Sequence, residues 1–186
     1  RLRQRWINRA LGRDMADVLD AGLDVIPRSG MDNRLMTIDR TSWRMVRTPL
    51  FDKLILRCRR TGVQLVIIDT VSRTFGGRNF DELQVTQFLD ECLRLAEMIR
   101  GTVLLTQHPS MSGRKTGTGE AGTVQWEAGV RSRLYVHKHQ ALGLIVENMK
   151  ANYSRKAPPL KIEWQHGIFV PVEAPPAHNW VESAEA

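Results

Sequence analysis

Apolar side chains divide the chain into short strands and amphipathic helices. The run VQLVIID at residues 63–69 is almost continuously apolar and ends in an acid, which is typical of a parallel strand covered on both faces. From about Asp81 to Arg100, apolar residues recur three or four positions apart and predict a long helix with one buried face. The run TVLLTQ at 102–107 follows as a second buried strand. Strand, helix and strand in this order form a βαβ unit, so we expect the two strands to be parallel.

The pattern before this unit predicts shorter elements. LDVIP (23–27) and RLMTID (34–39) have the pattern of short strands, separated by a turn at Ser29-Gly30. Residues 49–62 predict a helix that Pro49 opens and Gly62 ends. Residues 1–20 predict a basic helical region with a modest apolar stripe.

The pattern after the unit favours antiparallel structure. A Gly- and Ser-rich loop at 109–122 leads to a short helix near Val124–Gly129. The alternation within 133–150 predicts an antiparallel pair, and 159–172 predicts a hairpin with a turn at His166-Gly167. We therefore expect an α/β domain over residues 1–172, with a parallel core and an antiparallel C-terminal extension. The Pro- and Ala-rich acidic residues 173–186 predict a disordered tail.

Composition narrows the class of protein. The chain has 186 residues, of which 42% are hydrophobic and 25% charged, and this favours one soluble domain. No apolar run approaches the roughly 20 residues that a bilayer span needs, so we expect no membrane association. Two distant cysteines make neither a disulfide framework nor a cysteine zinc site, which favours a reducing, cytoplasmic compartment. The net charge of +7 suggests a polyanionic partner.

Polar side chains end both strands of the βαβ unit. Asp69 closes the first strand, and Gln107 and His108 close the second, so we expect all three at the crevice where open α/β sheets bind ligands. An acid at this position associates with Mg²⁺ in P-loop ATPases, and a polar residue on the neighbouring strand suits a γ-phosphate sensor. Each feature alone also occurs without function, because a strand-end Asp can cap a turn and a His before Pro is usually an ordinary loop residue.

Basic residues occupy the two loops that follow the paired strands, spaced by glycines: Arg73, Arg78, Arg114 and Lys115. Flexible basic loops at one end of a sheet suit contact with the phosphate backbone of DNA, without reading of bases. Phe75 and Phe80 are candidates for stacking on bases. The alternative is that these charges are solvated loop residues.

Arginines also lie where we expect the last parallel strand to begin, after the Gly-rich loop. Arg131 and Arg133 are placed to reach the γ-phosphate of a neighbouring subunit, where a guanidinium stabilises transition-state charge. The alternative is that both arginines are solvated residues at a strand end. The same two interpretations apply to Lys150. Two other patterns fail. His137-x-His139 lacks a third metal ligand nearby, and GRKT at 113–116 lacks the P-loop spacing.

The ordered set of motifs resembles the RecA-like P-loop ATPases of the RepA type, which are hexameric replicative helicases of plasmids and phages. LVIIDTVSRTF resembles the family's Walker B strand, and TVLLTQHPS its histidine-ended sensor strand. AGTVQWEAGVRSRLYV resembles the segment that carries the arginine finger, and VENMKANYS the K-x-N-Y element. RLRQRWINRALG and IEWQHGIFV resemble the segment after the second core strand and the closing hairpin.

The resemblance implies a role for each matching residue. Asp69 becomes the Walker B acid that associates with Mg²⁺ through a water, and Gln107 and His108 lie near the γ-phosphate of ATP, with His108 as its sensor. Arg131 becomes the finger offered to the next subunit, and Lys150 a basic residue near the same interface. The loops 72–80 and 109–122 take the places of the two DNA-facing loops, with Arg73, Arg78, Arg114 and Lys115 on DNA.

The family's P-loop and its catalytic glutamate are absent from these 186 residues. We therefore expect the chain to be the C-terminal part of a longer ATPase, truncated at its N-terminus and inactive alone. The intact protein is expected to hydrolyse ATP in a homo-oligomeric, hexameric ring and to translocate along or remodel single-stranded DNA. One alternative is a non-catalytic DNA-binding or ring-assembly module, and another is a recombinase-like or clock-type ATPase of the same superfamily.

Overall fold

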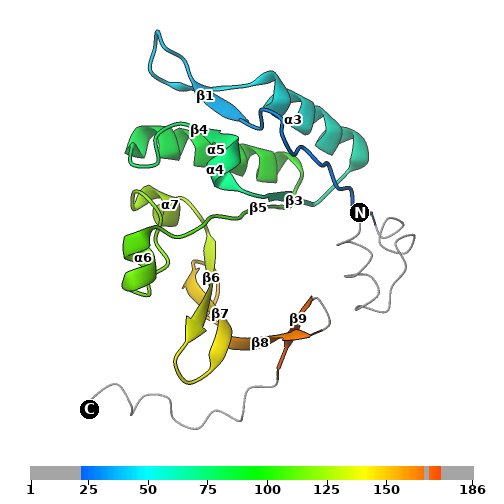
Figure 1. Ribbon diagram of the computed structural model, residues 1–186. Helices are drawn as coiled ribbons and strands as arrows, with labels where there is room; N and C mark the ends of the chain where they lie inside the picture. Colours follow the sequence, from blue (N-terminus) through cyan, green and yellow to red (C-terminus); the bar gives the residue numbers. More distant parts are fainter. Residues whose placement is uncertain (1–21, 166–167, 173–186) are drawn as a thin grey trace. The chain divides into compact units, whose positions relative to one another are not determined.

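The computed structural model describes residues 22–165 and 168–172 (Figure 1). Residues 28–131 form one compact unit, and the strands from Ser132 to Pro171 belong to a second. Among the described helices, none combines the length and apolar character that crossing a bilayer requires. The predicted helix at 1–20, the turn at His166-Gly167 and the tail at 173–186 lie outside the described residues.

The βαβ unit has the predicted form. Strands β3 (Leu65–Ile68) and β5 (Thr102–Leu105) are parallel and in register, with Ile68 opposite Leu105. Helix α5 (Glu82–Met98) lies between them in the chain and begins where the Asp81 side chain accepts a hydrogen bond of 3.0 Å from the Gln84 N–H. Its buried face carries the predicted stripe of Val85, Phe88, Leu89, Cys92 and Leu95.

The expected cover of both strand faces is wrong for the described residues. Val66 and Ile68 are buried, whereas Leu65 and Ile67 are 54% and 53% exposed, and Leu104 beside Ile67 is 44% exposed. Because side chains alternate along a strand, the core packs against only one face of this two-stranded sheet. The continuous apolar run therefore predicted burial on both faces of these strands, whereas only one face is buried.

A small mixed sheet accompanies the unit in the order β2-β1-β4. The predicted strand within 34–39 is present as β1 (Met36–Ile38), antiparallel to β2 (Met45–Arg47) and parallel to β4 (Phe75–Gly76). The sequence did not predict β2 or β4. The strand predicted at 23–27 is wrong, since those residues pair with no strand and Pro27 has no N–H to give to a ladder.

Helix α3 (Pro49–Thr61) confirms the prediction at both ends. Pro49 occupies the first turn, where its missing N–H costs no hydrogen bond. Gly62 ends the helix in the left-handed conformation, with φ of 65°, and its N–H donates to the Cys58 carbonyl. Phe51 and Cys58 are buried on the inner side of the helix.

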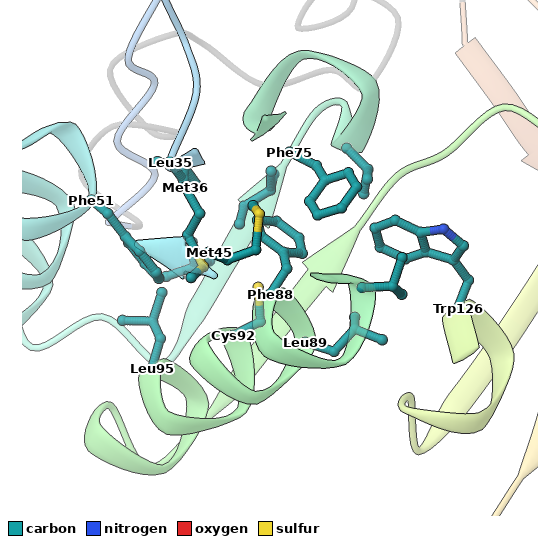
Figure 2. Close-up of a cluster of buried hydrophobic side chains, with 14 of the residues drawn as sticks. Leu35, Met36, Met45, Phe51, Phe75, Phe88, Leu89, Cys92, Leu95 and Trp126 are labelled. Carbon is teal, nitrogen blue, oxygen red and sulfur yellow. The ribbon is translucent and has the colours of Figure 1, made fainter. Parts of the chain in front are cut away.

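One hydrophobic cluster joins these elements in residues 28–131. Figure 2 shows side chains from β1, β2, α3 and α5 meeting in it, with Phe75 and Trp126 at one end. The Phe75 ring lies edge-on to Phe88, at 5.3 Å between centroids, and to Trp126, at 5.2 Å. Such aromatic pairs add to the stabilisation from apolar burial.

The rest of the chain contains short helices and then an antiparallel sheet. Helices α4 (Val71–Thr74) and α6 (Met111–Lys115) interrupt segments that the sequence predicted as loops, while α7 (Gln125–Ala128) confirms the helix expected near 124–129. The second unit has the sheet order β6-β7-β8-β9 with antiparallel pairing throughout: β6 (Ser132–His139), β7 (Gly143–Ala151), β8 (Leu160–Gln165) and β9 (Ile168–Pro171).

Candidate functional site

The aligned ends of β3 and β5 place Asp69 beside Thr106. Because Ile68 and Leu105 are opposite each other, the next residue of each strand lies at the same level. The Thr106 hydroxyl donates a hydrogen bond of 2.6 Å to Asp69 Oδ1, and the Thr106 N–H donates to the Ile68 carbonyl at 3.1 Å. The Asp69 side chain is exposed, so its other oxygen faces solvent. Thr106 therefore orients a carboxylate that stays available to a ligand.

Gln107 and His108 follow Thr106 directly at this edge of the sheet. Gln107 is half-buried and His108 is exposed. The Thr106 carbonyl accepts a hydrogen bond of 2.9 Å from the Val71 N–H, which ties the segment after β5 to the segment after β3. The structure thus brings both residues to the same end of the two strands as Asp69, as the sequence predicted.

Thr106 was missed by the sequence analysis. The signal was present in the run TVLLTQ, where a hydroxyl directly follows a buried strand at the level of the acid on its neighbour. A hydroxyl in this position fixes one oxygen of the carboxylate and leaves the other free to accept from water.

Arg131 and Lys150 belong to different compact units. Arg131 is exposed and is the last residue of the unit that holds Asp69. Lys150 lies on β7, directly opposite Arg133 of β6. The structure therefore groups Lys150 with Arg133 within the second unit. Their predicted roles at a subunit interface stay predictions.

The two predicted DNA loops touch each other. The Thr123 N–H donates a hydrogen bond of 3.1 Å to the Asn79 carbonyl. Gly122 lies so close to the same carbonyl that an added Cβ would be 2.4 Å from its oxygen. The loop at 72–80 and the end of the loop at 109–122 consequently form one surface within the first compact unit.

The basic side chains of these loops are exposed and their backbones are held. Arg73 lies on α4, and the Arg78 N–H donates 2.8 Å to the side chain of the buried Gln84. Arg114 and Lys115 lie in the last turn of α6, which begins where Ser110 caps the Gly113 N–H. Four exposed cations are thus carried on anchored backbone: Arg73, Arg78, Arg114 and Lys115.

The two phenylalanines predicted to stack on bases differ in their exposure. Phe75 is only 6% exposed, and its ring packs in the core, so its proposed contact with bases is wrong. The β pairing of Phe75 with Met36 turns the side chain inward, which a loop assignment did not anticipate. Phe80 is 81% exposed, and its stacking on bases stays a prediction.

Other groups with possible chemistry have structural partners. Burial raises the pKa of the Cys92 thiol to about 12 and also raises that of Cys58, so neither is poised as a nucleophile. His137 Nε2 lies 2.9 Å from Glu147 Oε2, and its ring stacks on Tyr135. His139 Nδ1 accepts hydrogen bonds from the backbone N–H groups of Ala141 and Leu142.

The donor set at the strand ends fits an Mg²⁺ ion. Mg²⁺ in nucleotide sites takes one or two protein oxygens, with phosphate oxygens and waters completing its coordination. Asp69 offers an exposed carboxylate whose only hydrogen-bond partner among the described residues is Thr106. Asp69 is therefore the residue that would hold the ion, through a water.

Comparison with known proteins supports the fold. A KaiC-like protein from the hyperthermophilic archaeon Pyrococcus horikoshii is similar in structure, with a TM-score of 0.52 and 18% sequence identity. The similarity covers 90% of this chain and 70% of that chain, and it shows a RecA-like arrangement. A search of curated protein sequences finds no match.

The sequence also matches a protein family directly. The model of the family described as AAA domain matches residues 1–114, which is more than half of the chain. Asp69, Gln107, His108 and Arg114 lie inside the matched segment, and Arg131 and Lys150 lie beyond it. From the extent of this match and the RecA-like fold, the chain belongs to the AAA domain family of P-loop ATPases.

Proposed function

We propose that this chain is part of a RepA-type ring ATPase that hydrolyses ATP and moves along or remodels single-stranded DNA. The observation that carries the proposal is the Asp69–Thr106 pair at the aligned ends of two parallel strands, followed by Gln107 and His108. The family match, which includes these residues, supports nucleotide hydrolysis.

Each residue has a distinct task in this proposal. Asp69 holds a water of the Mg²⁺ ion, and Thr106 keeps the carboxylate oriented. The bound ion would supply charge neutralisation for the β- and γ-phosphates. Gln107 and His108 hydrogen-bond near the γ-phosphate and respond when it leaves, and Arg131 offers its guanidinium to the nucleotide of the next subunit.

The joined loops are the proposed DNA contact. Arg73, Arg78, Arg114 and Lys115 are exposed around a surface where the two loops are hydrogen-bonded to each other. Because the loops leave the same strand ends as Asp69 and Thr106, a change at the nucleotide has a short path to the DNA contact. This arrangement supports coupling of hydrolysis to movement on DNA.

The test uses the protein translated from the complete gene. We expect Mg²⁺-dependent ATP hydrolysis that single-stranded DNA stimulates, measured by phosphate release. Replacing Arg114 and Lys115 by Ala should weaken DNA binding and flatten its log–log salt dependence by about one unit per lost contact. DNA binding without any hydrolysis would favour the non-catalytic module instead, and an unchanged salt slope would place these two residues away from DNA.

A further inference from the structure

The turn between β1 and β2 presents an exposed tryptophan. Residues 39–44 form this turn, which we call the β1–β2 tip, and Figure 1 shows it projecting from the first compact unit. Trp43 is 63% exposed, whereas Met36 and Met45 of the flanking strands are 2% and 7% exposed. The Met45 N–H also donates a hydrogen bond of 2.9 Å to Gln87 Oε1 on α5. The indole is therefore held away from the core on an anchored hairpin.

Hydrogen bonds inside the β1–β2 tip fix its shape. Asp39 Oδ1 accepts from the Thr41 N–H at 3.1 Å, and Asp39 Oδ2 accepts from the Ser42 hydroxyl at 2.6 Å. The Trp43 N–H donates to the Asp39 carbonyl at 2.8 Å, and the Asp39 N–H donates to the Arg44 carbonyl at 2.9 Å. The one acid of the tip is thus occupied by the turn itself.

Trp43 has a backbone conformation that a bulky residue rarely adopts. Its φ is 56°, in the left-handed region that favours Gly. The indole is not needed to close the turn, since the residue contributes its backbone N–H and the ring is mostly exposed. A large exposed side chain in an unfavourable conformation points to contact with another molecule.

Two cations flank Trp43 within the tip. Arg40 and Arg44 are exposed, and among the described residues neither guanidinium has a hydrogen-bond or ion-pair partner. Arg47, just beyond the tip, is by contrast paired with Glu91. Each free guanidinium therefore keeps its five N–H donors for a ligand.

The pairing of β1 with β4 places the tip beside the first of the two proposed DNA loops. The strands are parallel, with Thr37 opposite Gly76. Because parallel strands end at the same edge of a sheet, the tip after β1 and residues 77–80 after β4 leave the sheet on the same side. Arg78 is exposed in that segment, and Phe80 is 81% exposed. The tip therefore continues the surface on which the proposed function places single-stranded DNA.

We propose that the β1–β2 tip binds a single strand of nucleic acid, with Trp43 stacked on an unpaired base and Arg40 and Arg44 on the adjacent phosphates. Every base offers a flat face to an aromatic ring, and the bases of a duplex are already covered by their neighbours. A phosphate ion or an acidic peptide would use the two arginines alone, whereas the indole between them fits a ligand with a flat ring beside each negative charge. The inference rests on the DNA contact of the proposed function and does not rest on hydrolysis.

The test measures binding of fluorescein-labelled oligothymidylate by anisotropy, with the 186-residue chain and without nucleotide. A second oligonucleotide of the same length carries no bases. Trp43→Gly should bind oligothymidylate roughly 5- to 100-fold more weakly, the effect of losing one stacked base, and its affinity for the abasic oligonucleotide should be unchanged. Arg40→Gln with Arg44→Gln should weaken binding of both. Its log–log salt slope should fall by about 1.4, at about 0.7 for each phosphate of a single strand.

The choice of Gly separates binding from folding. Because Gly adopts a positive φ without strain, the free energy of unfolding of Trp43→Gly, measured in urea, should not fall. If circular dichroism shows that this variant is unfolded, Trp43→Phe and Trp43→Leu decide. The first keeps an aromatic face and should keep most of the affinity for oligothymidylate, and the second should lose it. Equal affinities of these two variants would overturn the proposal.

Matched controls come from the other compact unit. Trp164→Ala removes an indole that is 57% exposed, and Arg155→Gln with Lys156→Gln removes two exposed cations. Neither control should change the affinity for oligothymidylate. Unchanged binding of oligothymidylate by folded Trp43→Gly, an equal loss for the abasic oligonucleotide, or an equal loss in a control would overturn the proposal.

Two further outcomes separate the proposal from its neighbours. If Trp43→Gly keeps its oligonucleotide affinity and instead weakens self-association in sedimentation, the tip is a contact between copies of the chain and the proposal is wrong. If only the loop variant, with Arg114 and Lys115 replaced by Ala, loses oligonucleotide binding, the tip proposal fails while the proposed function stands. If only the tip variants lose binding, the tip proposal stands and the proposed contact of Arg114 and Lys115 fails.

Discussion

The two compact units differ in how they bury apolar side chains. In residues 28–131, one cluster includes Phe51, Val85 and Phe88, each with no exposed surface. In the sheet β6–β9, Ile145 and Ile162 are the buried apolar residues among those described. Five large apolar side chains of that sheet remain about half exposed: Leu134, Val136, Leu160, Trp164 and Phe169. Among the described residues, side-chain packing holds the first unit, and backbone ladders are the main contacts of the sheet.

The difference follows from what covers each sheet. In the first unit, α5 brings one continuous stripe against the strands, and α3 adds a second. In the sheet, the register places Val136, Val146 and Leu160 on one face, and no described helix lies between Ser132 and Val172. An antiparallel sheet buries its apolar face only when another layer packs on it.

The residues proposed for function also lie in both units. Asp69, His108 and Arg131 belong to the first unit, and Lys150 belongs to the sheet. If the account is right, the largest effects on activity and on stability both come from residues 28–131.

The largest effect is expected from Arg131→Ala in the complete gene product. ATP should bind normally while turnover falls by roughly 10³- to 10⁵-fold, because a finger in trans stabilises only the transition state. Single-turnover hydrolysis together with nucleotide binding measures both quantities. Lys150→Ala, in the sheet, should have a smaller effect on turnover.

Subunit mixing tests whether Arg131 acts in trans. Arg131→Ala mixed with Asp69→Asn should recover some hydrolysis, since some interfaces then pair an intact site with an intact arginine. Arg133→Ala, measured in parallel, tests whether Arg133 is the finger instead of Arg131. No recovery in rings that demonstrably exchange subunits would rule out the trans assignment.

The next largest effect is expected from Phe88→Ala. The ring has no exposed surface and packs edge-on against Phe75 and Trp126. The free energy of unfolding should fall by about 3–5 kcal/mol, because removal of the ring leaves a cavity in a packed core. Urea denaturation of the 186-residue chain measures the change. A loss under about 1 kcal/mol would mean that the cluster does not hold this unit together.

Phe169→Ala makes the same chemical change in the sheet and serves as its counterpart. Phe169 is 52% exposed, and its ring contacts Trp164 at 4.7 Å between centroids. The free energy of unfolding should fall by about 0.5–1.5 kcal/mol, the range of one aromatic pair. A decrease in the free energy of unfolding as large as that from Phe88→Ala would show that another layer covers the face of the sheet that carries Trp164 and Phe169.

The smallest effect is expected at Cys92. Burial raises the pKa of its thiol to about 12, so at about pH 8 the group stays protonated and shielded in the folded chain. Iodoacetamide should label it only as fast as the unit unfolds, and labelling should accelerate in Phe88→Ala. Rapid labelling of the native chain, located by mass spectrometry, would contradict the burial.

The sequence predicted the elements whose pattern is local and periodic. The stripe from Val85 to Leu95 predicted α5, and Pro49 and Gly62 predicted both ends of α3. It missed β2 and β4, which are three and two residues long and exist only because β1 lies between them. Pairing between residues distant in the chain leaves no periodic signal in so short a segment.

The sequence predicted which site residues lie at the strand ends, but it did not predict the contacts between them. Asp69 and His108 follow apolar runs, so their placement at the strand ends could be deduced from the parallel order. The hydrogen bond from Thr106 and the contact between Asn79 and Thr123 depend on register and loop conformation, which the pattern does not specify. Phe75 was wrongly predicted to stack on bases, because the sequence pattern does not distinguish an aromatic residue in a loop from one in a two-residue strand.

The most direct test of the central claim is the turnover of Asp69→Asn in the complete gene product. The change is nearly isosteric and keeps an acceptor for the Thr106 hydroxyl, so folding and oligomerisation should be unaltered. Loss of the charge that holds the water of Mg²⁺ should lower kcat by roughly 10- to 100-fold or more. An unchanged kcat at saturating ATP and Mg²⁺ would show that Asp69 only caps the end of its strand, and the account of this site would be wrong.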